Sequence, residues 1–170
     1  MISNAITYRF NGSARKITTP MGVSMPNGNP LEVVAIWDTG ATNSVITLDV
    51  AKRLNLCSEG STVINGVTGS QVVDSYLVTF ILPNGFSKDI FATSCTAAIG
   101  CDVLIGMDII SMVDFAITSG QQGTTFSFKT PHGKDSGSKT IAYNQLKTQT
   151  NSHFTKKPTT HPTPYLRNIF

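Results

Sequence analysis

The chain has 170 residues, of which 40% are hydrophobic, and it carries a formal net charge of +3. This length favours one domain with extensions, and the hydrophobic content is sufficient for a closed core. It contains no run of about 18 or more apolar residues, which excludes a conventional membrane-spanning helix. The first nine residues lack a basic region followed by an apolar stretch, so no secretion signal is visible.

The three cysteines, Cys57, Cys95 and Cys101, are odd in number and irregular in spacing. This pattern argues against a disulfide framework and favours a reducing compartment, so we expect a cytoplasmic protein. No Cys/His cluster has the spacing of a zinc site, and no glycine pattern is typical of nucleotide binding. We therefore expect neither a metal nor a cofactor.

The charge is distributed unevenly along the chain. Residues 131–170 carry a net charge of +5, whereas residues 1–130 carry −2. The apolar periodicity fades after Pro131, so we expect a folded domain over 1–130 and a basic, polar C-terminal extension over 131–170, mobile or dependent on a partner. Such a tail can contact nucleic acid, but its aromatic residues are widely spaced, and we do not expect nucleic-acid binding.

Alternating apolar residues at Ile6, Tyr8 and Phe10 predict a first strand. Gly, Asn and Pro are frequent in Met21–Pro30, which predicts a loop or a wide hairpin turn. Leu31–Trp37 is β-branched and nearly continuously apolar, so it is predicted to be a strand buried on both faces.

Ser44–Ile46 begins another predicted strand, and Thr47 can cap a short helix over Leu48–Asn55. The inner face of this helix is predicted to carry Leu48, Ala51 and Leu54.

The rest of the domain shows short apolar runs separated by Gly, Pro and Asn. We predict strands over residues 61–64, 70–82, 86–93, 103–106, 114–118 and 124–129, and one or two helical turns over 108–112. Short strands bounded by turns, with one or two small helices, predict a mainly β protein that forms a barrel or a closed sandwich.

The most informative residues are Asp38-Thr39-Gly40-Ala41, which directly follow the apolar strand Leu31–Trp37. A carboxylate against apolar surroundings is disfavoured unless it is paired, hydrogen-bonded or protonated, so such a residue is a catalytic candidate. The alternative is an ordinary turn in which Asp38 bonds to its own backbone. A second segment, Asp135-Ser136-Gly137, has a similar sequence, but no apolar strand precedes it. The chain therefore contains one copy of the Asp motif in a strand-end context.

Three motifs occur together in order: the Asp38 turn with Ser44–Ile46 after it, a hairpin with glycines at its tip, and Val103–Gly106 followed by a short helix. Over about Leu31–Phe115 the chain resembles the retropepsins, the single-domain aspartic proteases of retroviruses and their cellular and bacterial relatives. The resemblance implies a closed barrel equivalent to one lobe of an acid protease.

The resemblance also implies a homodimeric aspartic endopeptidase that acts on peptides or proteins, with Asp38 of each subunit in the active site. Two adjacent carboxyls share one proton, so one activates water and the other donates to the scissile carbonyl. Thr39 would hydrogen-bond across the dimer, and Gly40 would allow the substrate backbone to approach. Ala41 replaces the hydroxyl residue usual in pepsin-like enzymes, so we expect activity near neutral pH.

By the same resemblance, the hairpin Val63–Val73 would be the flap that closes over substrate. Its expected functional residues are Ile64, Gly66, Val67 and Gly69. The substrate pocket is expected to include Ile36 and Leu104, whose apolar side chains favour hydrophobic residues beside the cleaved bond.

The chain departs from many viral members where an acidic residue after the motif pairs with an Arg after the second glycine. Thr42 and Met107 occupy these positions, so this salt bridge is absent, and Asp108 is expected to hydrogen-bond locally instead. The C-terminal extension makes a different dimer interface possible. Two alternatives remain open, namely a catalytically silent dimerisation or peptide-binding module and a protein that processes only its own tail.

Overall fold

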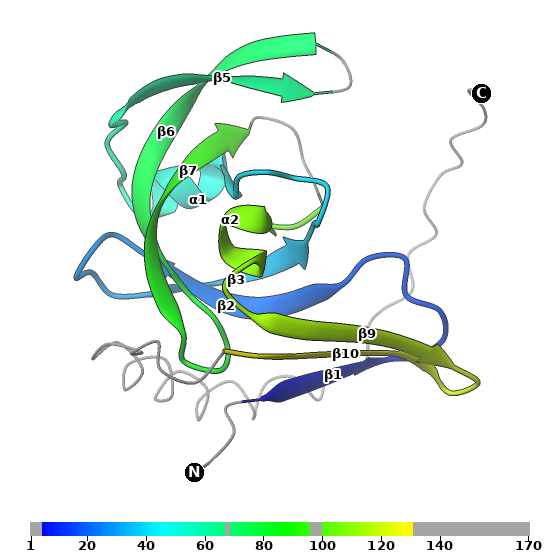
Figure 1. Ribbon diagram of the computed structural model, residues 1–170. Helices are drawn as coiled ribbons and strands as arrows, with labels where there is room; N and C mark the ends of the chain where they lie inside the picture. Colours follow the sequence, from blue (N-terminus) through cyan, green and yellow to red (C-terminus); the bar gives the residue numbers. More distant parts are fainter. Residues whose placement is uncertain (1–4, 67–68, 96–99, 131–170) are drawn as a thin grey trace.

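The protein is mainly β, as predicted, with ten strands and two short helices in the part of the chain that is described (Figure 1). The computed structural model describes residues 5–66, 69–95 and 100–130. The predicted extension over 131–170 and the flap residue Val67 lie outside these ranges.

Seven strands form the larger sheet, in the order β2-β3-β8-β4-β7-β6-β5. They are β2 (Thr18–Ser24), β3 (Leu31–Trp37), β4 (Val45–Thr47), β5 (Gly60–Gly66), β6 (Gly69–Ile81), β7 (Ser87–Cys95) and β8 (Val103–Ile105). Strand β2 also pairs with β6, from Gly22 opposite Ile81 to Ser24 opposite Thr79. This pairing joins β2, β3, β8, β4, β7 and β6 into a ring and leaves β5 outside it.

Three strands form the smaller sheet, in the order β1-β10-β9. They are β1 (Ile6–Phe10), β9 (Asp114–Gly120) and β10 (Gly123–Lys129). In Figure 1 this sheet lies along the bottom of the molecule, and the β5–β6 hairpin lies at the opposite end.

The core fills the ring and reaches the smaller sheet through aromatic side chains. The largest fully buried side chains include Met21, Ile46, Phe80, Ile105, Ile109, Phe126 and Phe128. The Trp37 ring at the end of β3 packs against two rings of β10, with centroids 4.9 Å from Phe126 and 5.0 Å from Phe128. Aromatic burial of this kind therefore holds the two sheets together at the carboxyl end of β3.

The predicted loop over Met21–Pro30 is wrong in its first half, because β2 continues to Ser24. Pro20 and Gly22 disfavour a strand by propensity, but burial overrides propensity here: Met21 and Val23 are fully buried. Pro20 is tolerated because pairing with β6 begins only at Gly22.

Strand β3 has the predicted bounds, but it is not buried on both faces. Val33 and Ala35 are buried, whereas Val34 on the other face is 46% exposed. The continuous apolar run therefore does not mark a fully covered strand. Ile36 lies on the same, less covered face as Val34.

The first helix, α1 (Leu48–Arg53), begins at the predicted cap, where the Thr47 hydroxyl accepts a hydrogen bond from the Val50 N–H at 3.4 Å. Its buried residues are Val50 and Ala51, so the predicted inner face is rotated towards Val50. The second helix, α2 (Met107–Ile110), is one turn that follows β8 directly.

Candidate active site

Asp38 lies directly after β3, where the backbone turns away from the sheet. Its N–H donates to the Ile105 carbonyl of β8 at 3.0 Å. Its carboxylate oxygen Oδ1 accepts from the Gly40 N–H at 2.8 Å, and its carbonyl accepts from the Ala41 N–H at 3.3 Å. Asp38 is half-buried, and Thr39 and Gly40 are exposed. The carboxylate is therefore oriented by its own turn and still accessible from outside.

The beginning of α2 fastens this turn from the other side. The Met107 N–H donates to the Ala41 carbonyl at 2.8 Å, and the Asp108 N–H donates to the Thr42 carbonyl at 3.1 Å. A Cβ atom on Gly106 would lie 2.6 Å from the carbonyl carbon and oxygen of Asn43. Two backbone segments far apart in the sequence are thus packed together at a position where only glycine fits.

A side-chain network completes the attachment. The Asp108 carboxylate accepts from the Ser44 N–H at 2.9 Å and from the Ser44 hydroxyl at 2.6 Å. The Ser44 hydroxyl oxygen also accepts from the Gly106 N–H at 3.0 Å. Asp108 was expected to hydrogen-bond locally, but its carboxylate bonds to Ser44, 64 residues away in the sequence. Sequence reasoning missed Ser44, although a hydroxyl residue directly before an apolar strand is the available signal.

Ile36 and Leu104, the two predicted pocket residues, lie opposite each other on the parallel strands β3 and β8. Both are half-buried, and Ile36 is two residues before Asp38. The register thus places two apolar side chains close to the carboxylate.

The predicted flap is the hairpin of β5 and β6, paired from Gly60 opposite Ser75 to Gly66 opposite Gly69. Ile64 lines a cavity of about 550 Å³ under this hairpin. The cavity also involves the start of α1 and the end of β7, and its lining consists of Leu48, Ile64, Gln71, Val72, Val73, Asp74, Ser94 and Cys95. Asp38, Ile36 and Leu104 are not among the residues that line this cavity.

A family model described as aspartyl protease matches residues 21–109, which is more than half of the chain. The chain belongs to the aspartyl protease family. The resemblance to retropepsins inferred from the sequence is confirmed. The match extends from β2 through the Asp38 turn and the hairpin to α2.

Several solved structures are similar to this aspartyl protease family member. EIAV protease in complex with the inhibitor HBY-793 is 26% identical, with a TM-score of 0.44, over 57% of this chain and 86% of that chain. A retropepsin-like aspartic protease from Rickettsia conorii is 10% identical, with a TM-score of 0.49, over 77% of this chain and 98% of that one. Simian foamy virus (mac) protease is 16% identical, with a TM-score of 0.37, over 55% and 92%. No curated protein sequence matches the chain.

Among residues 5–66, 69–95 and 100–130, no three His, Cys, Asp or Glu side chains are grouped so that they could hold a metal ion. Burial raises the pKa of the Cys101 thiol, which donates to the Val103 carbonyl at 3.1 Å, so this thiol is not primed as a nucleophile. None of the described helices is long and apolar enough to cross a membrane.

Proposed function

We propose that the chain is a homodimeric aspartic endopeptidase whose catalytic pair is Asp38 of one subunit and Asp38 of the other. The observation that supports this most directly is the attachment of the Asp38 turn to β8 and α2 by three backbone hydrogen bonds and the Ser44–Asp108 network. A catalytic carboxylate needs a fixed position and access to substrate, and Asp38 has both. Membership of the aspartyl protease family supports the same reaction class.

The proposed chemistry follows from bringing two carboxyls within hydrogen-bonding distance. They cannot both ionise cheaply, so they share one proton. The ionised carboxylate accepts a proton from a bound water as it attacks the peptide carbonyl, and the protonated carboxyl donates to the developing oxyanion. Thr39, exposed beside Asp38, would hydrogen-bond to the partner's turn. Gly40 leaves the turn without a side chain where the substrate backbone passes.

Substrate selection is proposed to involve the apolar residues nearest to this turn. Ile36 and Leu104 lie side by side before it, and the hairpin residues Ile64, Gly66 and Gly69 would close over the bound peptide. Val67, outside the described residues, completes the proposed flap. Apolar walls of this kind favour hydrophobic side chains on either side of the cleaved bond.

The test is cleavage of a mixed peptide library by the full chain and by Asp38→Asn, which keeps the side-chain shape but removes the acid. Asp49→Asn is the matched control, because Asp49 is an exposed carboxylate on α1 that pairs only weakly with Arg53, at 3.6 Å. We expect cleavage by the natural chain and by Asp49→Asn, and none by Asp38→Asn. Peptide binding without cleavage between pH 3 and pH 8 would favour a catalytically silent peptide-binding module instead.

We also propose that residues 1–130 are the protease domain and that residues 131–170 are an extension dispensable for folding. A chain ending after Thr130 should unfold at the same urea concentration as the full chain. Mass spectrometry of the full chain after incubation tests whether the tail is itself cleaved, since a self-processing protein would lose it.

A further inference from the structure

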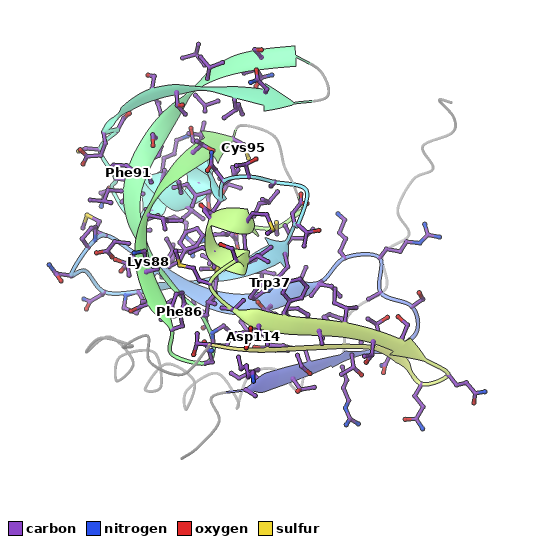
Figure 2. All side chains as sticks on the ribbon, viewed as in Figure 1. Trp37, Phe86, Lys88, Phe91, Cys95 and Asp114 are labelled. Atoms are coloured by element: carbon purple, nitrogen blue, oxygen red, sulfur yellow. The ribbon has the colours of Figure 1, made fainter. Side chains whose placement is uncertain are left out.

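The cavity under the β5–β6 hairpin has no role in the reaction described so far. Its volume of about 550 Å³ lies within the range of about 300–1,000 Å³ that is usual for ligand pockets. Among the described residues proposed to contact substrate, only Ile64 lines it. Figure 2 shows Cys95, another lining residue, at the end of β7 on the hairpin side of the molecule, whereas Trp37, next to Asp38, lies nearer the smaller sheet. The cavity is therefore a candidate binding site beside the catalytic turn.

The lining of this cavity combines apolar walls with one negative charge. Leu48, Ile64 and Val73 contribute apolar side chains, and Asp74 is the only charged residue among the described residues that line it. Lys and Arg side chains have an apolar stem and a positively charged end, and they bury the stem while the charge stays near water or an acidic partner. The lining is therefore complementary to a basic side chain.

The Asp74 carboxylate is held in place by a buried donor. Asp74 and Tyr76 are two residues apart on β6 and so lie on the same face. Tyr76 is only 7% exposed, and its phenol donates a hydrogen bond to Asp74. Burial and the neighbouring carboxylate raise the pKa of this phenol, so it remains a donor. The two ion pairs found among the described residues involve Asp49 and Asp114, so no basic side chain of the described part neutralises Asp74.

Strand register gives the separation between this cavity and the catalytic turn. Ile36, two residues before Asp38, lies opposite Leu104 of β8, which lies opposite Val45 of β4. Val45 in turn lies opposite Thr93 of β7, which directly precedes the two β7 residues of the cavity lining. Residues opposite one another share a face of the sheet. Three strand spacings of about 4.8 Å amount to about 14 Å, and an extended peptide covers this distance in about four residues.

We propose that the cavity binds a Lys or Arg side chain of the peptide substrate, about four residues from the cut bond, and that Asp74 selects this side chain. The inference rests on the proposed function and adds a substrate class to it. The preferred peptides carry apolar residues beside the cut bond and a basic residue farther out. In the proposed homodimer, the second cavity would take a second basic residue on the other side of the cut.

Peptide binding to the full chain with Asp38→Asn tests the cavity without any cleavage. The peptides have an apolar pair at their centre and either Lys or the uncharged Met at each other position in turn. Lys should bind about threefold to tenfold more tightly than Met about four residues from the pair, as expected for a partly exposed charge pair. Adding Asp74→Asn should abolish this preference. Adding Glu32→Gln is the matched control, because it removes the same charge at the start of β3 and should leave the preference unchanged.

Reversing the charge distinguishes selection from a merely structural role. Asp74→Lys should bind the peptide with Glu at that position more tightly than the peptide with Met, whereas general damage to the hairpin would weaken all peptides alike. An unchanged preference for Lys in Asp74→Asn would overturn the proposal, as would equal binding of Lys and Met peptides before that substitution. If the preference for Lys appeared only after removal of residues 131–170, the cavity would serve the basic tail of the chain, and the proposal would be wrong.

Cleavage of the same peptides by the natural chain separates this inference from the catalytic proposal. If the natural chain cuts Lys and Met peptides with the same kcat/KM at every position, the protease proposal stands and the basic subsite is rejected. If the preference for Lys in binding depends on Asp74 but the natural chain cuts none of the peptides, the subsite is retained and catalysis is rejected.

Discussion

The Asp108 carboxylate accepts hydrogen bonds from both the backbone N–H and the hydroxyl of Ser44, at 2.9 and 2.6 Å. Ser44 is fully buried, so its N–H has no access to water. The pair links α2 to the segment that follows the Asp38 turn, and its loss should affect both stability and activity.

Asp108→Ala should lower the free energy of unfolding by about 1–3 kcal/mol, because a buried donor is left without an acceptor. Urea denaturation measures this change. Asp49→Ala removes an exposed carboxylate with one weak ion pair and should change stability by less than about 1 kcal/mol. Equal effects of the two substitutions would mean that the Ser44 bonds do not stabilise the fold.

Gly106→Ala should reduce peptide cleavage strongly, because the new methyl group would overlap the Asn43 backbone and push the turn away from α2. Such overpacking typically lowers stability by about 1–3 kcal/mol. Gly120→Ala is the control, since a methyl group there would meet no atom within 4 Å. Full activity of Gly106→Ala at a concentration where it is folded would contradict the role of this contact.

Ile36→Ala should lower kcat/KM about tenfold or more for peptides with large apolar residues beside the cleaved bond, because lost pocket contacts of this size are worth about 1–3 kcal/mol. Val34→Ala makes a comparable truncation on the same face of β3, farther from Asp38, and should leave the preference unchanged. Library profiling of both variants checks this. If only Val34→Ala changed the preference for large apolar residues, Ile36 would not be part of the substrate pocket.

Ala41→Ser should shift the pH optimum of cleavage to lower pH. A hydroxyl next to the turn supplies a donor that stabilises the ionised carboxylate, so its absence in the natural chain favours activity near neutral pH. Rate profiles between pH 3 and pH 8 give both optima. A natural optimum below about pH 4, where isolated carboxyls titrate, would be inconsistent with this account.

Tyr8 makes a prediction for alkaline pH, because burial raises the pKa of its phenol from 10.0 to about 12. The raised value means that the neutral phenol is favoured in the folded state. This stabilisation is complete below pH 10 and is lost as the pH rises through 12. Tyr8→Phe cannot ionise, so its unfolding free energy should fall less between pH 10 and pH 12. Identical losses in both proteins would exclude Tyr8 as the cause.

Local sequence patterns predicted the parts of the fold that local chemistry decides. The strand Leu31–Trp37, the Thr47 cap and the paired glycines of the β5–β6 hairpin follow from propensity and turn residues within a few positions. Strand β2 was missed. Pro20 and Gly22 signal a turn, whereas the buried position of the strand depends on β3 and β6 far along the chain.

The candidate site shows the same division. Asp38 could be singled out because its motif directly follows an apolar strand. Ser44 could not be assigned its role, since its partner Asp108 is 64 residues away and only the folded chain brings them together. The exposed outer face of β3 was likewise invisible, because an apolar run does not indicate which side a neighbouring element covers.

The place where β6 leaves the ring has a mechanical consequence. Ser75 pairs with Gly60 on one side and Thr93 on the other, while the described residues of β6 before it have β5 as their sole strand neighbour. The hairpin beyond Ser75 is thus attached to the ring only at its base. Tilting the hairpin breaks no strand pairing within the ring. The length or stiffness of that hairpin can therefore be changed, by evolution or by engineering, while the ring beneath it keeps its strand pairing.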